Sequence, residues 1–397
     1  MKRKKTFILF LCIIIILPIS GCQKTPNDVK EKSLKHQKAE DVKETDIKYV
    51  SVDHILDNQE KVLSKTYQNL SFQNTVHLEQ PDSVSVLSLT VANPFGTKKK
   101  LADICSVFWG TDQYRKEIVR LDDLREFPGG IGVYAFNYYA DNTADSARMS
   151  DNGYVALYKE NAEMFTSNRQ TICHVDWNEN LDVVYDIGGE EVSIREAVDY
   201  VNNWCNKNWI TFEPEYSYQV KTVYVCKTKQ KGYYYYFDVC KVYKGMPFDD
   251  ISFYIDVDNF YIRNSLDVVM EHKNELSFFR NNNNSYDIAK NEEHNDKLIG
   301  LEQAILLVQE KMTGAQKFEI ADIDLKYVIR SDLTYNDLVE RDIPSYVMPG
   351  CPVTARPTWS FILDYQPGRE EEAGDPWPRK FINVDMISGE ILYRDSI

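Results

Sequence analysis

The fold follows from the stretch Ser193-Ile-Arg-Glu-Ala-Val-Asp-Tyr-Val201, because its pattern returns at Gly300-Leu-Glu-Gln-Ala-Ile-Leu-Leu-Val308. In the first stretch, Ser193 is followed three residues later by Glu196, a capping box that marks the start of a helix. Apolar residues continue the helical spacing of three and four, namely Ile194, Ala197, Val198, Val201, Trp204 and Cys205. The shared order of a cap, an apolar residue, Glu or Gln, Ala and a final Val predicts two related units.

Apolar and alternating runs after each helix predict antiparallel strands. They lie at residues 222–227, 233–243 and 251–257 after the first helix, and at 323–329, 358–365 and 379–384 after the second. Each copy has an apolar strand with acids beside it, Phe253-Tyr-Ile-Asp-Val-Asp258 and Phe381-Ile-Asn-Val-Asp385. We therefore predict two modules, residues 186–297 and 298–397, each a helix laid on an antiparallel sheet. The alternative is chance similarity between two amphipathic helices that precede strands.

The preceding segment, residues 49–185, is predicted to form a separate N-terminal α+β domain. Its signals are a hairpin over residues 70–91, helices at 98–109 and 115–124, and strands at 131–139 and 154–158. The whole chain is therefore assigned to the α+β class.

The first 22 residues carry the signal for export. Four cations at positions 2–5 precede an apolar run over residues 7–17, which ends in Pro18-Ile-Ser-Gly-Cys22. As a helix, that run measures about 16 Å at ~1.5 Å per residue, whereas a spanning helix crosses ~30 Å of hydrocarbon. We predict a signal peptide over residues 1–21 rather than a membrane span.

The end of this signal, Ile19-Ser20-Gly21-Cys22, resembles the lipobox of bacterial lipoproteins. The resemblance implies that the Cys22 thiol carries a diacylglyceryl group and becomes the mature N-terminus. Two acyl chains anchor a protein stably, so the expected location is the extracytoplasmic face of the cell membrane. An ordinary cleaved signal that happens to precede a cysteine is the alternative. Residues 22–48, rich in Lys, Glu, Asp and Gln, are predicted to be a flexible tether.

Net charge limits the possible binding partners, and the number of cysteines limits the possible disulfides. The net charge of −15 includes the four signal cations, so the remainder is more acidic still and would repel nucleic acid phosphates. Beyond Cys22 no basic cluster fits anionic lipid, and membrane contact is expected through the acyl chains alone. Six further cysteines, Cys105, Cys173, Cys205, Cys226, Cys240 and Cys351, leave buried thiols and disulfides equally open.

Catalytic motifs are missing from the sequence. It contains no GxSxG, SxxK, P-loop or HExxH pattern, and we predict no enzymatic activity, no cofactor and no metal site. Cys173 and His174 are adjacent, but neighbours on a strand point to opposite faces. The competing hypothesis is a surface hydrolase that uses carboxylates such as Asp256, Asp258 or Asp385, and it requires acids that converge in one cleft with a raised pKa. Asp322 and Asp324 form a similar pair on one strand face.

Trp359 and Trp377 are the candidate binding residues. Aromatic side chains of this kind either line a groove for a peptide or fill the core between a helix and a sheet. Trp377 lies between Pro376 and Pro378, which prevent regular strand pairing and favour an exposed loop.

The C-terminal residues carry a family resemblance. Pro357-Thr-Trp-Ser-Phe-Ile-Leu363, followed by Phe381-Ile-Asn-Val-Asp-Met-Ile-Ser-Gly-Glu390, resembles the C-terminal half of PepSY-type modules and of YycI-like regulatory proteins. In those modules a strand with a Trp pairs with a strand that ends in an Asp/Asn-x-x-Ser/Thr-Gly-Glu turn. The resemblance covers about the last hundred residues well, residues 186–280 loosely and the N-terminal third not at all. The first module departs from it, because Asp258-Asn-Phe-Tyr lacks the Ser-Gly-Glu turn.

With its lipobox, tether and two modules, the whole chain is similar to a family of uncharacterised lipoproteins from low-GC Gram-positive bacteria. The resemblance implies a non-enzymatic protein that binds or regulates a protein or peptide partner, and it supplies no catalytic residue. A solute-binding lipoprotein is a further alternative, which predicts two α/β lobes around a cleft.

Overall fold

The computed structural model describes most of the chain after residue 46. The described residues are 47–73, 76, 78–92, 98–110, 119–120, 133–137, 146–150, 155–159, 170–176, 180–228, 232–249, 251–254, 261–263, 265–281, 285–311, 318–331, 353–363 and 380–394. The chain divides into two compact units, Met1–Asp46 and Ile47–Ile397. The predicted signal, Cys22 and Trp377 lie outside the described residues.

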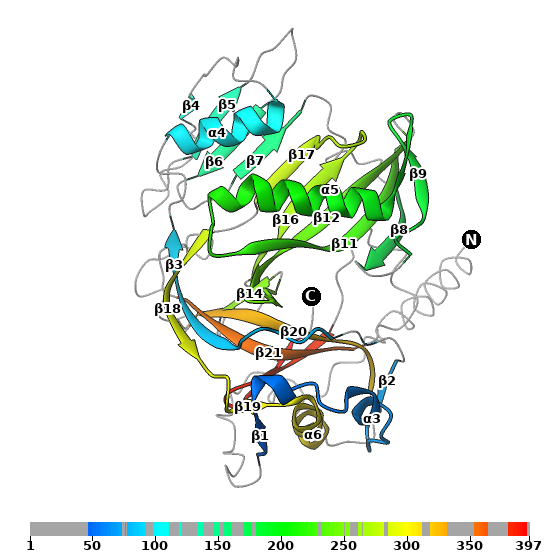
Figure 1. Cartoon of the computed structure of the whole chain (residues 1–397), viewed down its shortest axis with the longest axis vertical. Coiled ribbons are helices and arrows are strands. Elements are labelled where there is room, and N and C mark those ends of the chain that lie inside the picture. The colour runs from blue at the N-terminus through cyan, green and yellow to red at the C-terminus, as the bar shows by residue number, and fades with distance from the viewer. Residues whose placement is uncertain are drawn as a thin grey trace, which may run out of the picture. The chain divides into compact units, whose positions relative to one another are not determined.

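Two large sheets dominate the second unit, and the α+β class is confirmed (Figure 1). The first, 12-stranded sheet runs in the order β10 (Glu190–Ser193), β9 (Val184–Ile187), β12 (Gly232–Tyr243), β16 (Leu266–Met270), β17 (Phe278–Asn281), β7 (Val155–Tyr158), β6 (Ser146–Ser150), β5 (Val133–Asn137) and β4 (Val119–Arg120). Off this path, β11 (Ser217–Thr228) and β13 (Met246–Pro247) pair with β12, and β8 (Gln170–Asp176) pairs with β11.

The second, 9-stranded sheet runs in the order β15 (Tyr261–Arg263), β14 (Ile251–Tyr254), β20 (Phe318–Ser331), β21 (Val353–Leu363), β22 (Lys380–Asp385) and β23 (Ile391–Arg394). In addition, β2 (Leu70–Phe72) pairs with β20, and β3 (Ser85–Ala92) pairs with β21 and with β18 (Ser285–Glu293). A separate pair joins β1 (Tyr49–Val50) to β19 (Leu298–Ile299).

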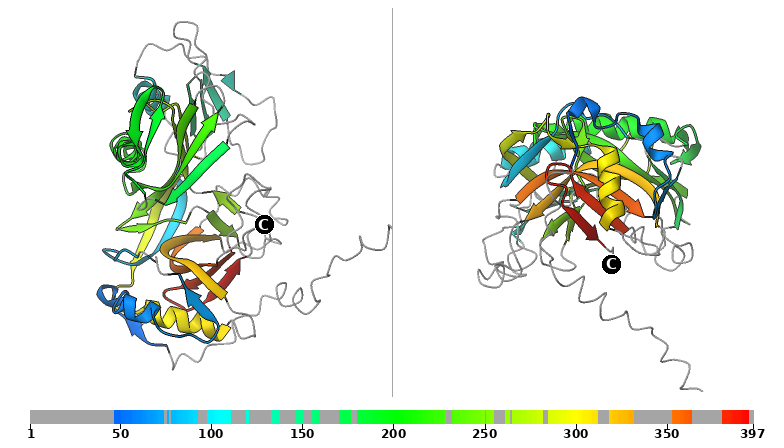
Figure 2. Two further views of the ribbon diagram at one scale, coloured as in Figure 1. Left: turned by 90° about the vertical axis from the view of Figure 1, so that its right-hand side faces the viewer. Right: turned by 90° about the horizontal axis from the view of Figure 1, so that it is seen from below.

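Each large sheet carries one of the two predicted helices on one face (Figure 2). The first, α5 (Ile194–Lys207), begins at the predicted capping box, where Ser193 Oγ accepts from the Glu196 amide at 3.1 Å. All six of its predicted apolar positions are buried, and within the nine-residue match the corresponding Leu301, Ala304, Ile305 and Val308 of α6 (Leu301–Lys311) are buried too.

The remaining helices are shorter or belong to the N-terminal segment. They are η2 (Val52–His54), α3 (Gln59–Leu63), α4 (Lys98–Trp109) and η5 (Trp209–Thr211). The bounds of α4 confirm the predicted helix at 98–109, whereas the predicted helix at 115–124 is wrong where the structure describes it, because β4 lies there. No helix in the described ranges is long and apolar enough to cross a membrane.

The strands after the two helices follow the same order. Antiparallel neighbours run β11-β12-β16-β17 after α5 and β20-β21-β22-β23 after α6. The proposed equivalence of residues 253–258 and 381–385 is wrong, because β14 pairs in parallel with β20 in the second sheet. The first-sheet counterpart of β22 is β16, which occupies the matching place beside β12.

The two helix starts are tied to their sheets by the same kind of hydrogen bond. In the first sheet the Tyr235 hydroxyl donates to the Val192 carbonyl at 2.8 Å, and in the second Trp359 Nε1 donates to the Ile299 carbonyl at 2.7 Å. Both donors are fully buried, and both acceptors lie two residues before the helix begins. Each bond satisfies a buried carbonyl that would otherwise carry a desolvation cost.

Strands of the predicted N-terminal domain, residues 49–185, are shared between both large sheets. Strands β4 to β7 extend the first sheet from β17, whereas β2 and β3 join the second sheet. Among the described strands this segment therefore forms no large sheet of its own, and the predicted boundary at 185/186 does not coincide with a sheet boundary. Pairing onto open strand edges satisfies their backbone groups, a demand that a local hydrophobic pattern does not reveal.

The helix-anchoring bond is tested by Tyr235→Phe. This change removes only the hydroxyl and leaves the buried Val192 carbonyl without its donor, so we expect a loss of about 1–3 kcal/mol in the free energy of unfolding. Tyr233→Phe, two residues away on the same strand and only half-buried, is the control. Urea unfolding monitored by circular dichroism gives both values, and equal midpoints for the two variants would contradict this role of the bond.

Candidate functional site

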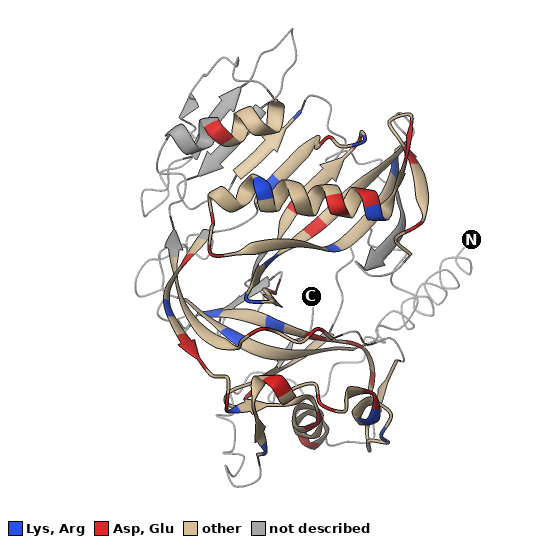
Figure 3. Ribbon diagram, viewed as in Figure 1, with Lys and Arg blue, Asp and Glu red and all other residues tan. Residues whose placement is uncertain are grey.

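Polar side chains line the face of the second sheet that points away from α6. Cross-strand neighbours form two rows over β20, β21 and β22, which are Asp324, Ser360 and Asn383, then Lys326, Thr358 and Asp385. Arg356 and Arg330 lie further along the same face, on β21 and β20. Figure 3 shows basic positions in blue on the strands of this sheet. These residues alternate with the apolar residues that pack toward the helix, as the period of a strand requires.

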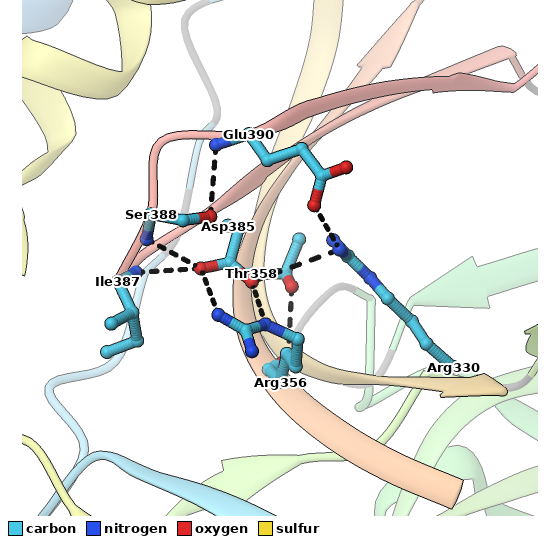
Figure 4. Close-up of polar contacts among 7 residues, drawn as sticks. All are labelled: Arg330, Arg356, Thr358, Asp385, Ile387, Ser388 and Glu390. Carbon is cyan, nitrogen blue, oxygen red and sulfur yellow. Dashed lines mark hydrogen bonds and ion pairs between the residues drawn. The ribbon is translucent and has the colours of Figure 1, made fainter. Parts of the chain in front are cut away.

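Asp385 is the centre of this polar face, and its side chain is fully buried. Its carboxylate accepts from Arg356 Nε at Oδ2 and from Arg356 Nη2 at Oδ1, the latter at 3.2 Å (Figure 4). Oδ1 also accepts from the amides of Ile387 and Ser388, each at 2.9 Å. Arg330 Nη1 lies 3.9 Å from Oδ2. The carboxylate therefore joins two strands to the turn after β22.

That turn has the conformation predicted from its sequence. Gly389 has a φ of +73°, which glycine adopts without the steric cost of a Cβ. Its amide donates to the Asp385 carbonyl at 2.9 Å, and the Asp385 amide donates to the Glu390 carbonyl at the same distance. The Glu390 side chain then accepts from Arg330 Nη1 at 2.9 Å. The turn thus places a second carboxylate, which is about half exposed, beside Arg330.

The pKa of Asp385 bears on the hydrolase hypothesis. Burial by itself raises this pKa, but the hydrogen bond and charge of Arg356, the charge of Arg330 and the Ser388 amide outweigh it and lower the pKa below its ordinary value. A general acid needs a raised pKa, so Asp385 is an ionised structural carboxylate. The other carboxylates named for this hypothesis, Asp256 and Asp258, lie outside the described residues.

The second predicted acid pair, on β20, is also engaged. Asp322 Oδ1 accepts from the Ile323 amide at 2.8 Å. Asp324 Oδ2 lies 3.6 Å from the ammonium groups of both Lys221 and Lys326. Lys221 belongs to β11, so this contact also links the two large sheets.

Further buried ion pairs were not predicted from the sequence. Glu213 accepts from Lys241 Nζ at 2.6 Å, from Trp209 Nε1 at 3.1 Å and from the Tyr218 hydroxyl. Lys326 Nζ lies 3.2 Å from Asp249. The sequence does contain a signal for Arg330 and Arg356, because polar residues recur at every second position of their otherwise apolar strands. This alternation does not identify the partner of either arginine on another strand.

Trp359 requires a correction as a binding residue. Its ring is fully buried against α6 and its Nε1 is bonded to Ile299, so it belongs to the core and not to an exposed groove. Trp377 lies outside the described residues, and its role stays a prediction.

The four cysteines whose side chains the structure describes are thiols outside any disulfide bond. Cys105, Cys205, Cys226 and Cys240 are buried, and burial raises the pKa of Cys205. The side chains of Cys173 and His174, on β8, and the whole of Cys351 lie outside the described residues. Within the described ranges, no group of three or more His, Cys, Asp or Glu side chains could hold a metal ion.

Comparison with known proteins adds information on the fold alone. No protein-family model matches the chain, and no curated protein matches it. The crystal structure of an uncharacterised protein from Eubacterium rectale is similar, with a TM-score of 0.54 and 13% sequence identity. The match covers 85% of this chain and 99% of that one. At this identity the likeness concerns the arrangement of the chain and carries no functional conclusion.

The Asp385 network is tested by Asp385→Asn, which keeps the shape and removes the charge. The partly exposed Arg356 and the buried Arg330 then lose this counter-charge, although Arg330 keeps Glu390, and we expect a loss of about 3 kcal/mol at pH 7, the lower end of the range for a broken buried pair. Because the pKa is lowered in the folded state, the ionised carboxylate contributes stability that is complete above the unfolded pKa of about 3.9 and is lost as the pH falls through the folded value. The difference from wild type should therefore be constant between about pH 5 and 8 and shrink in stronger acid.

The control for this variant is Asp182→Asn, which breaks the exposed pair between Asp182 and Arg195. Urea titrations at several pH values compare the two changes, and the midpoint of the control should stay at that of wild type. A pH-independent difference for Asp385→Asn would contradict the assignment.

Proposed function

We propose that this chain is a lipid-anchored extracytoplasmic protein that binds a protein or peptide partner, without catalysing a reaction. The observation that carries the anchor is the order of cations, apolar run and small residues that ends at Cys22. The tether over residues 22–48 holds the folded unit away from the membrane in this proposal.

The state of the carboxylates favours binding over acid/base catalysis. Asp385 is held by Arg356, Asp267 by Arg280 and Glu213 by Lys241. For Asp385 the hydrogen bond and charge of Arg356 and the charge of Arg330 lower the pKa despite its burial, which makes this carboxylate a poor proton donor. The same residues are well suited to keeping the sheets rigid, and a rigid sheet presents a partner surface at low entropic cost.

The resemblance to PepSY-type and YycI-like modules supports a regulatory outcome of binding. It rests on Trp359, Asp385 and the Ser388-Gly389-Glu390 turn. In this proposal the partner peptide binds the outer edge of β23, which pairs only with β22 among the described strands. Addition of a strand to such an edge uses main-chain hydrogen bonds for affinity.

The anchor is tested by Cys22→Ala in cells supplied with labelled fatty acid. We expect the variant to lose the label and to leave the membrane fraction, because no thiol remains to carry the diacylglyceryl group. Cys12→Ala, inside the apolar run, is the matched control and should keep both properties. A Cys22→Ala product that stays labelled and membrane-bound would contradict the proposal.

Partner binding is tested by crosslinking on intact cells, followed by recovery of the full-length chain. Trp377→Ala should reduce the yield of crosslinked partner several-fold, since an exposed aromatic anchor contributes about 2 kcal/mol or more to an interface. Trp109→Ala, on the half-buried end of α4, provides a control for general loss of an aromatic ring. Equal yields from wild type and Trp377→Ala would remove Trp377 from the interface, and the lack of any reproducible partner would count against binding.

A further inference from the structure

Arg330 is a buried cation with two of its three side-chain nitrogens unpartnered in the described part of the chain. The side chain is 4% exposed. Nη1 donates to Glu390 at 2.9 Å, but Nε and Nη2 have no hydrogen-bond partner in the described part of the chain. A buried charged donor without an acceptor carries a desolvation cost that nothing offsets.

The two unused donors lie on one edge of the guanidinium group. Nε–H and one N–H of Nη2 point in nearly parallel directions, and this fork matches the two oxygens of a carboxylate. The third nitrogen, Nη1, donates to Glu390, and this bond already orients the plane of the guanidinium group. The free fork is thus prepared for an acceptor and needs little further ordering to bind one.

Two other arginines of the same protein show which kind of acceptor the Nε/Nη2 edge binds. Arg356 directs Nε and Nη2 to the carboxylate of Asp385, and Arg280 directs the same two atoms to the carboxylate of Asp267. Arg330 is more deeply buried than either of them, yet it lacks a carboxylate on that edge. The charge of Arg330 is also only partly balanced, since Asp385 is 3.9 Å away and already held by Arg356.

We infer that the Nε/Nη2 edge of Arg330 is a binding site for a carboxylate group of a ligand. Nε and Nη2 are themselves closed to solvent, so a ligand would reach them only after a local displacement, such as that of the half-exposed Glu390 side chain on the same guanidinium group. The carboxylate has two chemical sources, a small organic acid or the C-terminus of a peptide. The second source deepens the proposed function and rests on it, whereas the first stands without it.

The experiment follows the Nε–H signal of Arg330 by NMR in the full-length chain labelled with ¹⁵N-arginine. The signal is assigned by its disappearance in Arg330→Lys. The probes are sodium acetate, N-acetyl-trialanine with a free C-terminus, and the neutral amide of that peptide. We expect at least one carboxylate probe to shift the signal, and the amide to have no effect.

Calorimetry with the active probe then compares variants. Arg330→Lys keeps the charge that faces Glu390 but lacks the fork, so its affinity should fall by about tenfold or more. Arg280→Lys changes an arginine whose fork is already filled by Asp267, and its affinity should match wild type. If the Arg330→Lys protein is unstable, Arg330→Gln serves as the second variant, because it removes the charge as well as the paired donors.

The outcomes separate the two sources and the two proposals. Binding of acetate without the peptide assigns a small organic acid, and binding of the peptide without acetate assigns a peptide terminus. The inference is overturned if neither probe binds or if Arg330→Lys binds as wild type does. Failure of the anchored-binding proposal would show instead in the Cys22 labelling and crosslinking results.

Discussion

The second sheet depends on the burial of one ionised carboxylate. Asp385 is fully buried, a position that is unfavourable for a lone charge by several kcal/mol. Its four donors, two from Arg356 and two from turn amides, offset that cost and make the charge stabilising in place. Since these donors come from β21 and from the turn after β22, the geometry of both elements follows from this one group. Arg330, on β20, completes the arrangement on its other side.

The same design is present in part in the first sheet. Met270 is paired with Tyr235 as Val384 is paired with Trp359, and Tyr235 and Trp359 are the two donors that anchor the helix starts. Glu271 therefore takes the place of Asp385, and it is also buried. The turn that follows is one residue shorter, with Asn274 in the left-handed conformation in place of Gly389. Asparagine tolerates this conformation better than most residues.

These particulars show what sequence reasoning could reach. The helices were predictable, because α5 and α6 each have a buried stripe at helical spacing and α5 has a complete capping box. The turn at Gly389 was predictable from its own residues. The counterpart turn at Asn274 was not predicted, because it contains no Gly and because residues 253–258 had been aligned with residues 381–385. Which strand edges β2, β3 and β14 join depends on pairing across the chain, and local periodicity contains no information on it.

Buried polar contacts were the least predictable part. Arg330, Arg356 and Asp385 come from three strands, and only the fold brings their charges together. Although the chain is acidic overall, Asp385, Asp267 and Glu213 are buried with basic partners. These ion pairs join different elements of the fold, and no local sequence pattern identifies the partners.

The central claim is that the carboxylate of Asp385 and the guanidinium of Arg356 act as one structural unit. A double-mutant cycle with Asp385→Ala and Arg356→Ala, measured by urea unfolding at pH 7, tests it most directly. Residues in one buried network give interaction energies of about 0.5–3 kcal/mol, and the account predicts a value in the upper half of that range, with the second substitution adding little to the first. Additive losses, with an interaction energy near zero, would contradict it.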